Sequence, residues 1–117
     1  MPIDNALASV AVTDLAVAER WYRELLGRDG SKPMPEVVEW KFPGGGGLQV
    51  YALAERAGHC SFTLAVRDIE TEINRLDGMG VDTSQRTSAP QVKTVMIIDP
   101  DGNHIALAES QDPSLVK

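Results

Sequence analysis

VAVTDLAVAERWYRELLG, residues 10–27, has a counterpart in LAVRDIETEINRLDGMG, residues 64–80. Each segment begins as an apolar strand, reaches an aspartate, and continues with the spacing of an amphipathic helix. The two aspartates, Asp14 and Asp68, lie 54 positions apart, nearly half the length of the chain. An aspartate in this place can accept hydrogen bonds from the free N–H groups of a first helical turn. The repeat therefore predicts two helices, at residues 15–26 and 69–79.

The segments after the two predicted helices are also alike. In the first half, residues 35–42 and 48–55 are strand-like and are separated by the turn PGGGG. In the second half, three strand-like segments follow the helix, at residues 81–88, 92–99 and 104–110. The second half reads as βαβββ, and the duplication predicts βαβββ for each half although only two strand-like segments are marked after the first helix. Repeats of this size usually pack against each other. We expect a single α+β domain over residues 1–117, with modules at about residues 1–56 and 57–117.

A polar turn, DPDGN, separates the last two predicted strands at residues 99–103. Pro100 has the φ angle preferred at the second position of a type I turn, and Gly102 can adopt the left-handed conformation of a hairpin loop. The alternative is a calcium loop. Here, however, glycine directly follows the second aspartate, whereas the calcium pattern places further ligands between them. The spacing therefore favours a hairpin.

The composition limits the kinds of partner that the chain can have. It contains 117 residues, with 11 Lys and Arg against 17 Asp and Glu, and a formal charge of −6. Nucleic-acid binding requires clustered basic residues, so this charge argues against it. Cys60 is the only cysteine, and the chain shows neither a signal peptide nor an apolar run of about 20 residues. We expect a cytoplasmic protein with no membrane partner.

The VTD…WYRELLG unit, the duplicated βαβββ pattern and the segment DPDGNHIALAE occur in an order that resembles the vicinal oxygen chelate superfamily. That superfamily includes glyoxalase I, extradiol dioxygenases, fosfomycin-resistance enzymes and bleomycin-resistance proteins. The resemblance covers nearly the whole chain. It implies two pseudo-symmetric βαβββ modules that form a curled mixed sheet around a cleft. It also implies a homodimer, since small members often build their clefts between two chains.

The resemblance further implies a divalent metal in the enzymes, held by His, Gln or Glu side chains from four strand positions. Here these positions correspond to Leu7, Gln49, Ser61 and Ala106. Leucine and alanine have no ligand atoms, and serine and glutamine are weak, neutral ligands for metals that prefer carboxylate or imidazole. We therefore expect no metal, no other cofactor and no catalytic residue. The alternative is a displaced metal site built from Gln49, His59 and His104.

A cleft without a metal could still bind an organic molecule. Alternation along a strand places Tyr51 on the same face as Gln49, and His59 on the same face as Ser61. Trp40 lies between charged residues in EWKF, and an aromatic ring in a cleft can stack on a planar or cationic ligand. A core or interface position is the alternative for Trp40. The expected ligand contacts are Trp40, Gln49, Tyr51, His59 and Ser61.

Two classes of function follow from the resemblance. The first is a metal-independent binding protein that sequesters a drug or metabolite, similar to the bleomycin-resistance proteins. The second is a metal-dependent lyase, isomerase or dioxygenase with a displaced metal site. The missing ligands favour the first class, and Glu36 and Glu39 would attract a cation if they lined the cleft. We expect the partner to be a small organic molecule, largely planar, and neutral or cationic.

Overall fold

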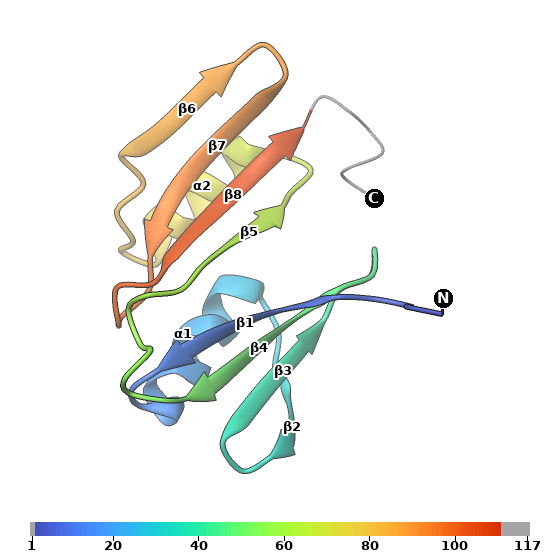
Figure 1. Ribbon diagram of the computed structural model, residues 1–117. Coiled ribbons are helices and arrows are strands. Elements are labelled where there is room, and N and C mark those ends of the chain that lie inside the picture. The colour runs from blue at the N-terminus through green and yellow to red at the C-terminus, as the bar shows by residue number, and fades with distance from the viewer. Residues whose placement is uncertain (1, 111–117) are drawn as a thin grey trace. The chain divides into compact units, whose positions relative to one another are not determined.

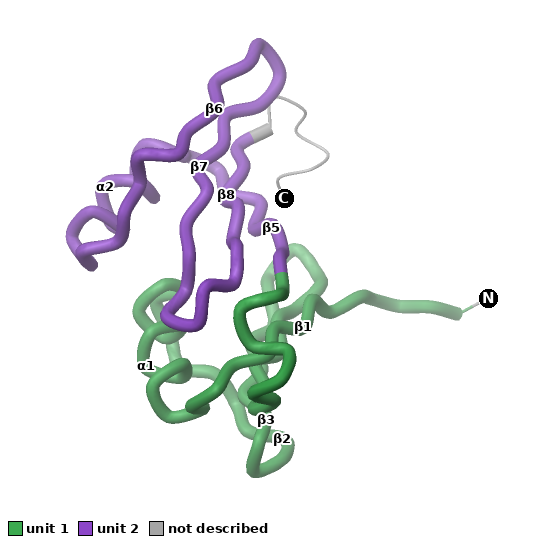
Figure 2. The backbone as a smooth tube through the Cα atoms, turned by 60° about the vertical axis from the view of Figure 1, so that its left-hand side comes forward, with its two compact units in different colours: residues 1–60 green, residues 61–117 purple. Residues whose placement is uncertain are grey.

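The computed structural model describes residues 2–110 of the chain. It divides into two compact units, residues 1–60 and residues 61–117, which we refer to as module 1 and module 2 (Figures 1 and 2). Each module is one helix and one four-stranded sheet. Within residues 2–110, neither helix has the length and apolar character needed to span a membrane.

Module 1 is a βαβββ unit, as the sequence predicts. Its strands form one mixed sheet in the order β1-β4-β3-β2, in which β1 and β4 are parallel and the other pairs are antiparallel. One strand, β2, falls outside every segment that the sequence marked as strand-like, because it is short and polar. The elements are β1 (Leu7–Val12), α1 (Leu15–Leu26), β2 (Ser31–Met34), β3 (Val37–Lys41) and β4 (Gly47–Ala52).

Module 2 repeats this topology. Its sheet has the order β5-β8-β7-β6, again with the first pair parallel and the others antiparallel. The prediction of an α+β fold with two βαβββ modules is therefore confirmed. The elements are β5 (Ser61–Ala65), α2 (Ile69–Gly78), β6 (Gln85–Ala89), β7 (Val92–Ile98) and β8 (His104–Ser110).

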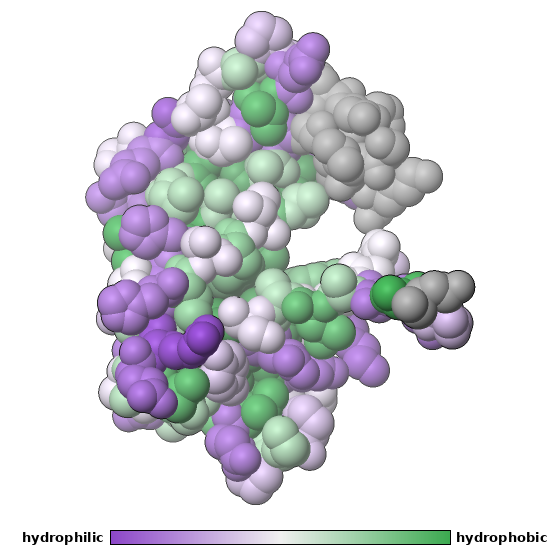
Figure 3. All heavy atoms as spheres, viewed as in Figure 1, coloured by the Kyte–Doolittle hydropathy of each residue, from purple (hydrophilic) through white to green (hydrophobic). Residues whose placement is uncertain are grey.

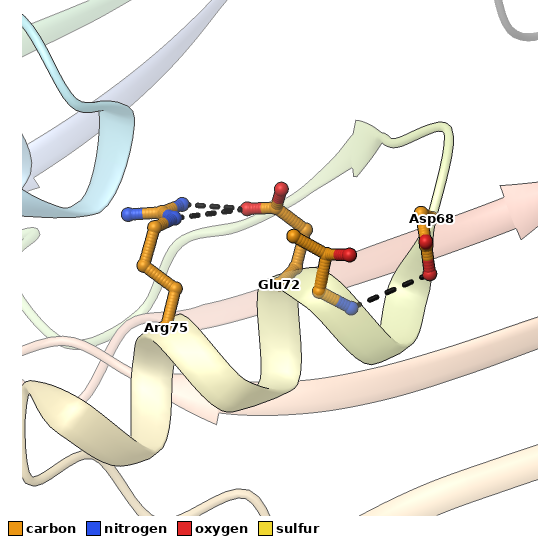
Figure 4. Close-up of polar contacts among 4 residues, drawn as sticks. Asp68, Glu72 and Arg75 are labelled. Carbon is orange, nitrogen blue, oxygen red and sulfur yellow. Dashed lines mark hydrogen bonds and ion pairs between the residues drawn. The ribbon is translucent and has the colours of Figure 1, made fainter.

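Both helices begin where the aspartates predict. The Asp14 carboxylate accepts a hydrogen bond from the Val17 backbone N–H at 3.1 Å, and α1 ends at Gly27, whose φ of 75° is left-handed. The Asp68 carboxylate accepts from the N–H groups of Glu70 and Thr71 at the start of α2, and Figure 4 draws one of these two bonds. Hydrogen bonding by the Thr71 side chain and by these N–H groups lowers the pKa of Asp68.

Module 2 anchors the start of its helix more firmly than module 1. The Glu109 carboxylate, on β8, accepts a hydrogen bond from the Ile69 N–H at 2.8 Å. Together with Asp68, it satisfies three of the four N–H groups that a helix start leaves free. One turn further along α2, Arg75 and Glu72 form an ion pair at 2.6 Å on the helix surface (Figure 4).

One face of each sheet packs against the helix of its own module. In module 1, β3 and β4 contribute buried Val38, Trp40, Leu48 and Val50 to this core. In module 2, β7 and β8 contribute buried Val95, Ile97, Ile105 and Leu107. Alternation along the strands leaves a second face on each sheet, opposite the helix. We refer to it as the distal face.

The DPDGN segment is a hairpin turn, as its spacing predicts. One Asp99 carboxylate oxygen accepts from the N–H groups of Asp101 and Asn103, both at 2.9 Å, and the other accepts from the Asn103 side chain at 2.8 Å. Asp99 and Asn103 are 4% and 0% exposed, and Gly102 has a φ of 95°. Because protein donors occupy both carboxylate oxygens, this aspartate serves the turn rather than a calcium ion.

Candidate functional site

The distal face of module 1 carries the polar side chains that lie close enough to act together. Three neighbouring strands of its sheet, β1, β4 and β3, lie side by side in Figure 1, and their register arranges the distal residues in three cross-strand rows. The rows are Leu7–Gly47–Lys41, then Ser9–Gln49–Glu39, then Ala11–Tyr51–Val37.

Hydrogen bonds link the side chains of the middle row, Ser9, Gln49 and Glu39, and we refer to these three residues as the polar row. The Ser9 hydroxyl donates to Gln49 Oε1 at 3.4 Å, and Gln49 Nε2 donates to Glu39 Oε2 at 2.9 Å. A carboxylate can only accept, so it fixes which end of the Gln49 amide points toward it. The Gln49 oxygen is then left to accept from the serine hydroxyl.

Glu39 forms no ion pair within residues 2–110, although Lys41 lies two residues away on the same face of β3. Within residues 2–110, the ion pairs are Arg23–Asp29, Lys32–Glu19 and Arg75–Glu72, and none involves Glu39. The side chain is half-buried, and Gln49 is its one side-chain partner among the described residues. The polar row therefore presents a partly desolvated negative charge that the described part of the chain does not neutralise.

The rows on either side of the polar row are mainly apolar. Tyr51 is half-buried between Ala11 and Val37, which are themselves buried. On the other side, Leu7 is 43% exposed and lies against Gly47: a Cβ on Gly47 would come within 3.2 Å of the Leu7 side chain. The distal face of module 1 thus combines one aromatic ring, small or aliphatic neighbours, one anionic polar row, and the exposed Lys41 at the end of β3.

The distal face of module 2 has a different chemistry. In its register, Ala106 pairs with Thr63 on β5 and with Met96 on β7. The neighbouring pairs join Ala65 with Ala108 and Ser61 with His104. The surface over β7 and β8 is mostly pale green and white in Figure 3, consistent with small and apolar side chains. No carboxylate lies on this face in the rows just described.

The expected ligand contacts are divided between the two modules and the segment that joins them. Gln49 and Tyr51 share the distal face of module 1, as strand alternation predicts. Ser61 is the first residue of β5 and lies on module 2, paired with His104. His59 is exposed and lies in the link, residues 53–60, which joins β4 to β5. Its N–H donates to the Arg56 carbonyl. Strand alternation therefore does not orient His59, contrary to the expectation from the sequence.

Trp40 lies on the opposite face from Gln49, in the core of module 1. It is 1% exposed, its ring centroid is 6.3 Å from that of Tyr22, and its Nε1 donates to the Arg28 carbonyl at 2.9 Å. A Cβ on Gly30 would come within 2.8 Å of the ring, so the backbone also covers it. Trp40 is therefore a core residue, which was the alternative to a ligand contact, and its ring is not available to stack on a ligand at the distal face.

The residues present do not fit the divalent metal that the fold family implies. Among residues 2–110, no group of three or more His, Cys, Asp or Glu side chains could hold a metal ion. The strand register also changes which residues could act together with Gln49 and Ala106. Ser9, and not the expected Leu7, lies directly beside Gln49, and Thr63, and not the expected Ser61, lies directly beside Ala106. Ser9 and Thr63 carry hydroxyl groups, which are weak ligands compared with imidazole or carboxylate.

The sequence alone does not identify Glu39 as part of a polar row, and indicates only a charge that would attract a cation if it lined a cleft. The signal that could have found it is the register of the β3–β4 hairpin, which pairs Glu39 with Gln49. That register was not available from strand alternation alone, because alternation assigns faces within a strand and not partners across strands.

Comparison with known proteins agrees with this architecture. A family model described as a glyoxalase-like domain matches residues 8–108. The chain belongs to this glyoxalase-like family. No curated protein matches it significantly.

Several solved structures of the family resemble the chain over most of its length. A glyoxalase/bleomycin resistance protein from Catenulispora acidiphila DSM 44928 is 34% identical, with a TM-score of 0.80, over 90% of this chain and 96% of that one. TnmS3, an antibiotic binding protein from Streptomyces sp. CB03234, is 26% identical, with a TM-score of 0.82, over 95% and 99%. A glyoxalase/bleomycin resistance protein from the same Streptomyces strain is 28% identical, with a TM-score of 0.76, over 89% and 98%.

Proposed function

We propose that this protein binds a small organic molecule without a metal and sequesters it as a drug or metabolite. The distal face of module 1 supplies the contacts. The observation that carries the proposal is the hydrogen-bonded row of Ser9, Gln49 and Glu39, which lies beside Tyr51 in place of a set of metal ligands. Binding sites for organic molecules commonly combine apolar and aromatic surface with a few oriented polar groups.

Each part of this face has a distinct role in the proposal. Tyr51 offers a ring that can stack on a planar molecule without requiring one particular substituent. Ala11 and Val37 lie beside Tyr51 in the same cross-strand row and add no polar group next to the ring. Gln49 and Glu39 supply fixed polar atoms that orient the ligand, because their mutual hydrogen bond restricts both side chains.

The similarity to TnmS3 supports binding rather than catalysis. That protein is an antibiotic binding protein, and it matches 95% of this chain. The two glyoxalase/bleomycin resistance proteins are consistent with either class of function, since their names include both. An enzyme of the same superfamily, with a displaced metal site, is the alternative that the experiments below address.

The first experiment measures metal content. Protein purified without a chelator or affinity tag is analysed by mass spectrometry, and we expect no stoichiometric divalent ion. One ion per chain that is lost in the variant His59→Ala would contradict the proposal and support the enzyme alternative.

The second experiment measures ligand binding directly. A thermal-shift screen with planar natural products selects a binder, and calorimetric titration compares wild type with Tyr51→Ala. We expect Tyr51→Ala to weaken binding by about 1–3 kcal/mol, the range for losing one stacked aromatic contact. Val17→Ala, which truncates an exposed apolar residue on α1, is the matched control and should bind as wild type does. Conversion of the binder to a new product would favour the enzyme alternative.

We also propose that the protein is a homodimer. Each sheet ends in strands that have a neighbour on one side only, namely β1 and β2 in module 1 and β5 and β6 in module 2. Open strand edges invite pairing unless charge or proline guards them. β2 has both guards, Lys32 and Pro33, whereas β6 has no proline. Light scattering that finds a monomer throughout the micromolar range would contradict the dimer.

A further inference from the structure

We infer that Glu39 makes the distal face of module 1 selective for ligands that carry a protonated nitrogen, and that Gln49 positions the Glu39 carboxylate for this purpose. The inference rests on the proposed function and deepens it, because that function leaves open whether the ligand is neutral or cationic. It assigns Glu39 as a specificity-determining residue and Gln49 as a positioning residue.

The surroundings of Glu39 leave its charge only partly compensated. The side chain is half-buried at the centre of β3, between Ser31 on β2 and Gln49 on β4. Its one side-chain hydrogen bond among the described residues comes from the neutral amide of Gln49. A carboxylate that loses part of its hydration needs charged or multiple donors to recover the loss. An ammonium or amidinium group of a ligand would supply a charge-assisted hydrogen bond, which is about twice as strong as a neutral one.

The hydrogen bonds within the polar row hold the carboxylate in one orientation. Gln49 Nε2 bonds to Oε2 of Glu39, so Oε1 is the oxygen left without a partner among residues 2–110. Ser9 in turn fixes the far end of the Gln49 amide. A ligand cation therefore meets an oxygen that is already oriented, and less rotational freedom is lost on binding than for a surface glutamate.

The charges around the row favour a cation over an anion. Lys41 is two residues from Glu39 on the same face of β3, but it is exposed and does not pair with Glu39. Lys32, on β2, is engaged by Glu19 of α1 at 3.3 Å. The net charge of −6 adds a long-range attraction for cations. An anionic ligand would have to approach an unneutralised carboxylate, whereas a cationic one would neutralise it.

The test uses two planar probes that differ mainly in charge. One is 9-aminoacridine, a cation at pH 7, and the other is acridone, a neutral molecule with the same three fused rings. Fluorescence titration of the full chain measures the affinity for each probe. We expect wild type to prefer 9-aminoacridine. We expect Glu39→Gln to weaken 9-aminoacridine binding roughly tenfold or more, the range for a charge-assisted hydrogen bond, while acridone binding stays within about twofold.

Three variants separate selectivity from a general effect on folding. Glu39→Gln keeps the shape of the side chain and removes its charge. Glu55→Gln makes the same change at an exposed site in the link and should behave as wild type. Gln49→Ala should lower the ratio of the two affinities, because Glu39 is no longer oriented, whereas a merely structural role would lower both affinities together. The 9-aminoacridine affinity of wild type should also fall more steeply with salt than that of Glu39→Gln.

The outcomes distinguish this inference from the proposed function beneath it. If wild type binds both probes equally, or if Glu39→Gln weakens both to the same extent, the face binds planar molecules and the selectivity of Glu39 is overturned. If wild type binds neither probe, the proposed function of this face is overturned, and the inference with it.

Discussion

Modules 1 and 2 share a topology but differ in what their distal faces carry. The third residue of β4 is Gln49, and it pairs with Ser9 and Glu39. The third residue of β8 is Ala106, and it pairs with Thr63 and Met96. The same three places in the register thus hold a hydrogen-bonded anionic row in one module and small or apolar side chains in the other. Since both modules fold alike, the distal face is free to vary while the helix-packed face maintains the fold.

The helix-packed faces differ in a second way. Residue Trp40 of β3 and residue Ile97 of β7 pair with Leu48 and Ile105 in corresponding places, and all four are buried. At this place module 1 therefore has a large aromatic ring, packed near the buried Tyr22 ring of α1, and module 2 has a branched aliphatic side chain. The larger side chain makes more of the core packing in module 1 depend on this one residue.

The largest expected effect is on stability, and it tests how far the core packing of module 1 depends on Trp40. We predict that Trp40→Ala lowers the free energy of unfolding by about 3–5 kcal/mol, because it removes a buried ring and leaves a cavity. Ile97→Ala should cost about 2–5 kcal/mol, and less than Trp40→Ala, since Trp40 also loses its packing on Tyr22 and its hydrogen bond to Arg28. Denaturant unfolding of both variants measures the difference. A cost below about 1 kcal/mol for Trp40→Ala would mean that the ring is not a core residue.

A smaller effect is expected where the backbone of module 1 is tightly packed. A Cβ on Gly47 would come within 2.8 Å of the Trp40 carbonyl oxygen, which belongs to the backbone and cannot easily move. We predict that Gly47→Ala costs about 1–3 kcal/mol, the range for overpacking. Gly78→Ala in α2 is the matched control, because a Cβ there has no neighbour within 4 Å. It should stabilise module 2 by up to about 1 kcal/mol. Equal effects of the two substitutions on thermal unfolding would contradict this contrast.

Most of the fold could be predicted from the sequence because its signals are local. The aspartate caps and the apolar stripes identify both helices, and DPDGN identifies the β7–β8 hairpin. Strand β2 could not be predicted, because SKPM is short, polar and exposed along its whole length, so it shows no alternation. Local signals also do not mark the start of β5, so alternation from Ser61 extends back to His59 although the strand begins at Ser61.

Less of the candidate site could be predicted, because it depends on register. Alternation within β4 correctly placed Gln49 and Tyr51 on one face. The charged neighbours of Trp40 suggested an exposed ring, yet Glu39 and Lys41 point to the distal face and leave Trp40 between them on the helix side. Flanking charges in a strand therefore indicate the environment of the opposite face. The pairing of Glu39 with Gln49 is a contact across strands, and no pattern within either strand contains it.

The starts of the two helices give a further prediction of intermediate size. In module 1, the Asp14 carboxylate bonds to Val17, and Ala52 stands in β4 where Glu109 stands in β8. An alanine cannot supply the additional acceptor that Glu109 provides to Ile69. We predict that Asp14→Ala costs about 1 kcal/mol, as is typical for loss of an N-cap. Asp14→Ser should recover most of this in urea unfolding. A serine variant as unstable as the alanine variant would contradict capping by Asp14.

The smallest expected effect is a pH dependence confined to module 2. Hydrogen bonding by the Thr71 side chain, and then by the N–H groups of Thr71 and Glu70, lowers the pKa of Asp68 in the folded state. A carboxyl whose pKa is lowered by folding stabilises the protein above its unfolded pKa, about 3.9, and this stabilisation is lost as the pH falls through the lower folded value. Asp68→Asn keeps an N-cap but removes the titration, because asparagine caps helices about as well as aspartate.

We therefore predict that wild type exceeds Asp68→Asn in stability at pH 7, and that the difference narrows as the pH falls below about 4. Urea unfolding of both proteins across this range measures the difference at each pH. Other carboxylates, including Asp82, whose pKa is also lowered by hydrogen bonding with Ser84, titrate in both proteins and cancel in the comparison. A difference that stays constant from pH 7 to pH 2 would show that the charge of Asp68 does not contribute. The start of α2 would then depend on the hydrogen-bond geometry of the cap and on Glu109, rather than on an ionised aspartate.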